Sequence, residues 1–127
     1  MILPCLYIAP TPKMGRGVFT SEKLKARTVI EIAPVIVLSK ADRKLIDQTT
    51  LYNYIFEWGD DHDQCCMALG YVPVYNHSYR SNCEYEMDYE NDLISIKTVR
   101  AIRAGEELFI NYNGEWNNEK KLWFEAI

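Results

Sequence analysis

A short stretch between residues 73 and 83, PVYNHSYRSNC, concentrates groups that can form hydrogen bonds or contact a ligand. It carries amides, hydroxyls, an imidazole and a thiol close to apolar neighbours: Asn76, His77, Ser78, Asn82 and Cys83. A loop that enters the interior must satisfy its backbone amides, and short side chains that donate and accept can do so. The stretch therefore predicts a buried polar network. Residues 76–78 also fit an N-glycosylation sequon, but we expect no signal peptide and favour the network.

The histidines and cysteines are the other candidates for site chemistry, as metal ligands or disulfides: His62, His77, Cys5, Cys65, Cys66 and Cys83. Adjacent residues of a strand point to opposite faces, so Cys65 and Cys66 cannot easily share one tetrahedral ion. No CxxC pair is present, and the cysteines are too few and too irregularly spaced for a secreted disulfide framework. We expect no metal site and an intracellular location, cytoplasmic in a bacterium and nuclear in a eukaryote or virus.

Two glycines and a polar-ended strand could bring backbone groups to a ligand. Gly15-Arg16-Gly17 would allow close approach of the backbone, because glycine has no Cβ. The turn lacks the helix and third glycine of a dinucleotide-binding fingerprint, and by itself it is typical of a hairpin. Residues 108–112, LFINY, are by themselves a core strand with a polar end.

The elements that must position these groups are mostly short strands. Alternation, β-branched residues and flanking turn residues predict strands at 3–9, 17–20, 28–38, 54–58, 64–69, 83–89, 93–99 and 108–112. Pro34 interrupts the third of these and predicts an edge position or a bulge. Ser39 can cap a helix that continues through residues 44–52, and a short helix is predicted at 117–126. The absence of regular strand–helix alternation indicates a mainly β domain with short helices.

Composition fits one globular domain of 127 residues, with 48% hydrophobic and 25% charged residues. The net charge of -4 argues against a general nucleic-acid binder, which needs a basic face. Two acidic runs suit a basic partner or are solvated faces: Glu57, Asp60, Asp61 and Asp63, and Glu84, Glu86, Asp88 and Glu90. The apolar first twelve residues are broken by prolines and too short to span a bilayer, so we expect no membrane association.

Taken together and in this order, three segments resemble a SET domain, the fold of many protein-lysine methyltransferases. They are GRGVF at 15–19, MALGYVPVYNHSYRSNCEY at 67–85 and EELFINY at 106–112. The chain is most similar to the minimal viral and bacterial members, because flanking cysteine-rich zinc segments are absent. The resemblance implies a single SET domain over residues 1–127 with a short C-terminal aromatic tail. Its fold would be a β-clip of several small sheets with a C-terminal pseudoknot.

The resemblance also implies S-adenosylmethionine as the cofactor. Asn76 and His77 match the pair that contacts it, and Ser78 and Asn82 would tie their loop internally. Arg16 and Gly17 would hold the methionine part through backbone groups, where a side chain at Gly17 would intrude. Trp116 matches an aromatic residue that stacks on adenine in compact members.

The implied reaction is in-line transfer of a methyl group from the sulfonium to a neutral lysine amine. Tyr112 matches the catalytic tyrosine, which also borders the cofactor, and Tyr54 and Tyr85 match tyrosines that line the lysine channel. Ile110 stands where some relatives carry the Phe or Tyr that governs product order, and Asn111 replaces a common aspartate. Tyr85 favours mono- or dimethyl-lysine as the main product. Trp116 and residues 122–124 are candidates to roof the channel.

The substrate implied by the resemblance is a lysine-containing basic protein or peptide, added as a strand in a groove, with a histone-like tail as one option. We expect no direct nucleic-acid partner, and self-association as a homodimer that completes the groove. Two other functions stay open from the residues. One is an inactive SET-like module that binds a peptide or cofactor without turnover, and the other is a small metal-binding scaffold.

Overall fold

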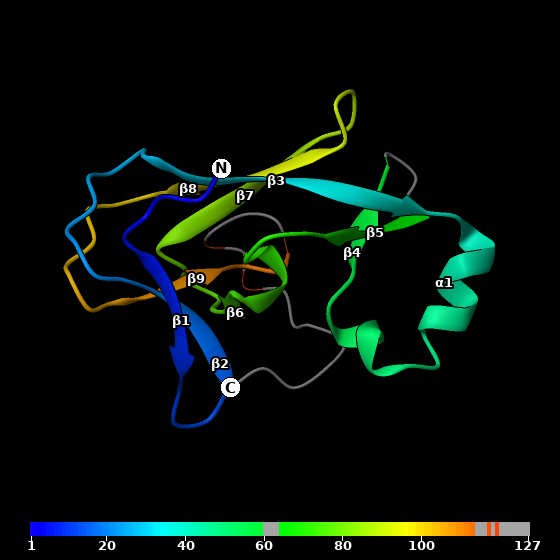
Figure 1. The fold of residues 1–127 in the computed structure, drawn as a ribbon, viewed down its shortest axis with the longest axis horizontal. Coiled ribbons are helices and arrows are strands. Elements are labelled where there is room, and N and C mark those ends of the chain that lie inside the picture. Colours follow the sequence, from blue (N-terminus) through cyan, green and yellow to red (C-terminus); the bar gives the residue numbers. More distant parts are fainter. Residues whose placement is uncertain (60–63, 114–116, 118, 120–127) are drawn as a thin grey trace.

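The computed structural model describes residues 1–59, 64–113, 117 and 119, and it is built mainly from short strands (Figure 1). The strands are β1 Leu6–Pro10, β2 Arg16–Thr20, β3 Val29–Leu38, β4 Phe56–Trp58, β5 Gln64–Ala68, β6 Asn76–His77, β7 Cys83–Asp88, β8 Leu93–Thr98 and β9 Glu107–Ile110. The helices are α1 Lys40–Ile46 and two short 3-10 helices, η1 Thr50–Asn53 and η2 Val72–Val74. The prediction of a mainly β domain is confirmed.

A four-stranded sheet, in the order β1-β2-β9-β6, carries the candidate cofactor segments. The hairpin β1-β2 and the pair β2-β9 are antiparallel, whereas β6 runs parallel to β9, with Asn76 opposite Phe109 and His77 opposite Ile110. This parallel pair places the Asn-His segment beside a strand that follows it by about thirty residues in the chain. The two motifs that the sequence separates are therefore neighbours in space.

A five-stranded sheet, in the order β4-β5-β3-β8-β7, forms the other layer, and β3 runs through its centre. The edge position expected from Pro34 is wrong for the strand as a whole. Residues up to Pro34 pair with β8, and residues from Val35 onward pair with β5, so the proline lies where one ladder ends and the other begins. Its missing N–H therefore interrupts neither ladder. The register irregularity of β3 lies earlier, between Val29 and Glu31.

Helix α1 begins at the predicted cap. The Ser39 hydroxyl accepts the Asp42 amide, and the Asp42 carboxylate accepts the Ser39 amide in return, a reciprocal capping box. The predicted continuation to residue 52 is wrong, because α1 ends at Ile46 and a turn separates it from η1. The α1 residues are not buried, so little packing would hold a longer helix. The predicted strand at 54–58 begins at Phe56, and the predicted helix at 117–126 lies largely outside the described residues.

The core is one cluster of buried side chains drawn from both sheets, including Val18, Ile30, Tyr75, Ile94 and Leu108. Each fully buried side chain of this size stabilises the fold by about 1.5–3 kcal/mol. All four cysteines are free. Among the described residues no helix is long and apolar enough to cross a membrane, and no cluster of His, Cys, Asp and Glu could hold a metal ion.

Candidate active site

His77 is held at the end of β6 by the backbone that follows β9. The Tyr112 amide donates to His77 Nδ1 at 3.0 Å, so Nδ1 is the acceptor and the ring proton resides on Nε2. The Ser78 amide donates to the Ile110 carbonyl at 3.1 Å and continues the pairing past the strand. Burial lowers the pKa of His77, which keeps the imidazole neutral. Its buried Nε2 has no hydrogen-bond partner among the described residues, so this donor is available to a ligand.

Asn82 binds the backbone of β9 with both ends of its amide. Its Nδ2 donates to the Glu107 carbonyl at 2.8 Å, and its Oδ1 accepts the Phe109 amide at 2.8 Å. The expectation that Asn82 ties the loop internally is wrong, because β9 lies close enough to take both bonds. Ser78 does act within the loop, where its hydroxyl accepts the Arg80 amide. The polar network predicted for residues 73–83 is therefore present, and it joins that loop to β9.

Asn76, Gly17 and Glu107 form a second contact between distant segments. Asn76 Nδ2 donates to the Arg16 carbonyl at 3.1 Å and to Glu107 Oε2 at 2.8 Å. A Cβ on Gly17 would lie 2.9 Å from Glu107 Cδ and 3.0 Å from Asn76 Nδ2, and would overlap Glu107 Oε2. Gly17 thus leaves room for two side chains of this chain, a reason that involves no ligand. Burial raises the pKa of Glu107, and the Asn76 hydrogen bond opposes that shift.

Tyr112, Tyr85 and Phe56 gather into an aromatic cluster between β4, β7 and the end of β9. The Tyr112 hydroxyl donates to the Tyr75 carbonyl at 2.7 Å, and the Tyr85 hydroxyl donates to the Tyr112 carbonyl at 3.2 Å. The Phe56 ring meets both tyrosines edge-on, with centroids 5.4 Å from Tyr85 and 6.5 Å from Tyr112. Burial raises the pKa of each tyrosine to about 12. Both phenols are therefore protonated at neutral pH and can orient groups but cannot act as bases.

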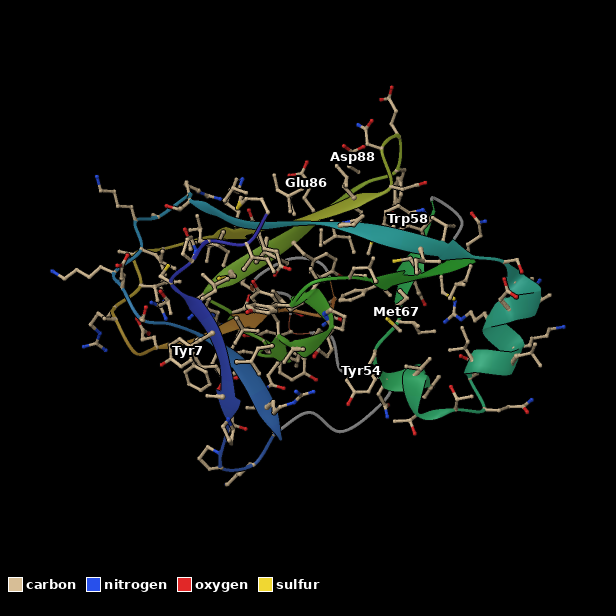
Figure 2. The ribbon with its side chains drawn as sticks, viewed as in Figure 1. Tyr7, Tyr54, Trp58, Met67, Glu86 and Asp88 are labelled. Atoms are coloured by element: carbon tan, nitrogen blue, oxygen red, sulfur yellow. The ribbon has the colours of Figure 1, made fainter. Side chains whose placement is uncertain are left out.

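Tyr54 lies at the edge of this cluster. It caps the C-terminal end of η1, is 44% exposed, and contributes to raising the pKa of Tyr112. Figure 2 shows Tyr54 beside η1, on the side toward the middle of the molecule. The structure thus brings Tyr54, Tyr85 and Tyr112 together, as the sequence predicts, with Tyr54 the most open to solvent.

Phe56 and Glu107 are site residues that the sequence analysis missed. Phe56 is predicted only as part of a strand, and its contacts with Tyr85 and Tyr112 arise from distant segments that the fold brings together. Glu107 lies inside the quoted motif EELFINY, and only the fold shows that it faces Gly17 and Asn76.

Asn111, the departure from the aspartate expected by resemblance, is 1% exposed and uses both ends of its amide. Its Nδ2 donates to the Tyr79 carbonyl at 3.2 Å, and its Oδ1 accepts the Asn113 amide at 2.9 Å. A carboxylate could not donate to the Tyr79 carbonyl, so the amide suits this loop. Ile110 is fully buried. Trp116 and the predicted aromatic roof at 122–124 lie outside the described residues.

Comparison with known proteins identifies the family of this chain. Residues 15–113 match the SET domain family. The chain is 37% identical over 121 residues to a Schizosaccharomyces pombe protein named histone-lysine N-methyltransferase, H3 lysine-37 specific, covering 94% of this chain and 77% of that one. The crystal structure of a Plasmodium falciparum protein assigned as a histone methyltransferase superposes with a TM-score of 0.66 and 25% identity, over 87% of this chain and 99% of that one. A structure of ctPRC2, autoinhibited and bound to S-adenosylmethionine, shares the fold at a TM-score of 0.72 and 17% identity, over 87% of this chain and 15% of that one.

Proposed function

Because the chain belongs to the SET domain family, we infer that it is an S-adenosylmethionine-dependent protein-lysine N-methyltransferase. The observation that carries this function is the pairing of the Asn-His strand with the strand that leads to Tyr112. Through that pairing, Asn76 and His77, which match the cofactor-contacting pair, lie beside the backbone that leads to Tyr112, which matches the catalytic tyrosine.

The residues present fit a cationic cofactor. We propose that Arg16 and Gly17, through backbone groups, together with Asn76, His77, Tyr112 and Trp116, hold it. The orphaned Nε2–H of His77 offers a buried donor, and the neutral imidazole adds no positive charge beside a sulfonium. Glu107 contributes a carboxylate next to Asn76. When bound, S-adenosylmethionine supplies the electrophilic methyl group and the leaving group.

The aromatic cluster of Phe56, Tyr85 and Tyr112 is the proposed end of the lysine channel, with Tyr54 at its entrance. A free lysine has a pKa of about 10.4, and an apolar channel favours its uncharged form. The amine lone pair forms the new N–C bond as the S–C bond breaks, and the surplus proton of the product leaves to solvent. Because Tyr85 and Tyr112 stay protonated, their task is to orient the amine rather than to take its proton.

The substrate is a protein, and we propose a basic, histone-like tail. Two observations support this proposal: the S. pombe relative is named for a histone lysine, and the chain carries a net charge of -4. A histone substrate in a eukaryote implies action in the nucleus. We also propose that the chain works as a homodimer.

The decisive experiment incubates the purified chain with methyl-labelled S-adenosylmethionine and a panel of histones and other lysine-rich proteins, followed by mass spectrometry. We expect label on lysine, strongest on a histone tail, and a loss of at least about a hundredfold in the Tyr112→Phe control, which keeps the ring but removes the orienting hydroxyl. A folded chain that binds the cofactor but labels no protein would instead be a binding module without turnover.

A further inference from the structure

A buried carboxylate lies outside the residues assigned so far. Glu31, in the central strand β3, has no exposed surface. It accepts two hydrogen bonds from a segment about forty residues away: the Tyr71 amide at 2.7 Å and the Tyr75 hydroxyl at 3.0 Å. These two donors stand immediately before and after η2, Val72–Val74. A single side chain therefore clasps both ends of this short helix.

The neighbouring backbone is shaped to admit this carboxylate. Gly70 adopts a φ of +69°, and a Cβ there would overlap Glu31 Oε2. Burying a carboxylate is unfavourable unless hydrogen bonds compensate, and burial raises the pKa of Glu31. An apolar residue would fill this interior position more simply, so the clasp calls for a role beyond filling space.

The clasp leads directly to the reacting centre. Tyr75 is 1% exposed, so its ring has no room to reorient. Its hydroxyl is fixed by Glu31, and its own carbonyl accepts the Tyr112 hydroxyl at 2.7 Å. Two hydrogen bonds thus connect the carboxylate in β3, by way of one residue, to the hydroxyl of the proposed catalytic tyrosine.

We propose that Glu31 is a positioning residue for methyl transfer: by clasping Tyr75 it fixes the carbonyl that orients the Tyr112 hydroxyl. This role rests on the proposed function. The simpler alternative is that Glu31 only stabilises the fold. The two differ in their consequences, because a positioning defect lowers turnover with bound reactants, whereas a general loosening also weakens binding and stability.

The test is Tyr75→Phe, which deletes the clasped hydroxyl and keeps the ring and the carbonyl. We expect kcat to fall about tenfold, the effect of losing one orienting hydrogen bond, while KM for the peptide and Kd for the cofactor stay within about twofold. Tyr7→Phe is the matched control, since Tyr7 is 40% exposed and stacks on Phe19 in the β1-β2 hairpin. Glu31→Gln keeps the size of the side chain but replaces one of the two accepting oxygens with an NH2 group that can only donate, so it should lower kcat in the same direction.

A second readout needs no turnover. In protein labelled with [13Cζ]-tyrosine, the Tyr112 resonance is assigned by its loss in Tyr112→Phe and reports the hydrogen bond of its phenol. We expect Tyr75→Phe and Glu31→Gln to shift this resonance, and Tyr7→Phe to leave it in place. If Tyr75→Phe or Glu31→Gln folds and leaves either the Tyr112 resonance or kcat unchanged, the proposal is overturned. The proposal is also overturned if kcat, KM and Kd all worsen together. A parent without turnover would refute the proposed function, and the resonance would still test the clasp.

Discussion

At the scale of single residues, the side chains between 73 and 83 divide into those used for structure and those left for ligands. Asn82 uses both its Nδ2 and its Oδ1 in hydrogen bonds to the β9 backbone, and Asn76 Nδ2 donates to both Arg16 and Glu107. His77 uses Nδ1 for the Tyr112 amide and keeps the Nε2 donor. The polar density of this stretch therefore serves first to fix the backbone around Tyr112, and only second to offer groups to a ligand.

The lowered pKa of His77 predicts the direction in which its contribution to stability changes with pH. Its folded pKa lies below the ordinary 6.5, and the unfolded chain takes up its proton near that value. Below about pH 6.5 the unfolded state thus binds more protons, so the stability that His77 contributes is present above this pH and is lost as pH falls through the folded pKa.

Proton NMR titration of a His62→Gln protein, in which His77 is the only histidine, measures this pKa directly. We expect a midpoint below 6.5, and a midpoint at or above 6.5 would contradict a neutral buried imidazole. The titration is preferable to a stability curve, because burial raises the pKa of Glu31 and Glu107 and these carboxyls affect stability with the opposite sign.

Tyr85 is predicted to limit how many methyl groups are added. Its hydroxyl donates to the Tyr112 carbonyl, so its oxygen is fixed and its lone pairs can accept from an amine beside it. A held amine is hindered from turning into line once it carries methyl groups, and fully buried Ile110 offers no second hydroxyl. We expect mainly mono- or dimethyl-lysine from the parent. Mass spectrometry of the products of Tyr85→Phe should show a shift toward trimethyl-lysine at unchanged cofactor affinity. If the parent already makes mostly trimethyl-lysine, Tyr85 does not control the product distribution.

At the scale of elements, the GRG turn offers a comparison between two glycines. Gly17 has ordinary backbone angles but no space for a Cβ against Glu107 and Asn76, whereas Gly15 has space and a φ of +67°. Gly17→Ala should therefore displace Asn76 and weaken the cofactor by roughly tenfold, about 1.4 kcal/mol. Gly15→Ala should cost about 1 kcal/mol of stability from strain and leave affinity within about twofold. Calorimetry measures the cofactor affinity of each variant, and urea unfolding measures its stability. Equal losses of affinity in the two variants would show that only the conformation of the turn matters.

The sequence predicts the elements that depend on neighbouring residues and misses those that depend on distant segments. The helix cap at Ser39 and the strand β7 depend on neighbours in the chain, and the sequence predicts both. The strand β6 has only two residues, too few to show an alternation of polar and apolar side chains. It forms by pairing with β9, which lies about thirty residues away in the chain. The place of Pro34 likewise depends on where β3 changes partners, which only the assembled sheet shows.

The candidate site divides in the same way. Tyr54, Tyr85 and Tyr112 were predicted through resemblance, and the structure places them around one cluster. Phe56 and Glu107 were not, because their roles arise from contacts between distant segments. From the sequence, Glu31 is an ordinary polar residue of an alternating strand. Its hydrogen-bond donors, the Tyr71 amide and the Tyr75 hydroxyl, reach it only when η2 folds against β3.

At the scale of the whole molecule, the outer face of β3 is the feature that the site leaves unexplained. Ile32, Pro34 and Ile36 alternate onto this face, and Leu69, whose amide donates to the Pro34 carbonyl, adjoins it. Ile36 is 51% and Leu69 44% exposed. An apolar row of this kind on a sheet face is typical of a surface that another molecule covers. It supports the proposed homodimer, which the sequence suggested through C-terminal aromatics instead.

Ile36→Lys tests whether this row holds two copies together. A lysine would bring an unpaired charge into a dimer interface, so the variant should become monomeric, while Leu45→Lys on α1, where Leu45 is 67% exposed, should not. Light scattering and sedimentation at assay concentration report the mass, and methyl transfer measured on the same samples shows whether the monomer works. We expect the parent to be a dimer. We propose that the neighbouring copy completes the substrate groove, and the Ile36→Lys monomer should then lose activity with its fold intact. A parent that is monomeric and fully active would reject the dimer, and a dimer that survives Ile36→Lys would place the interface elsewhere.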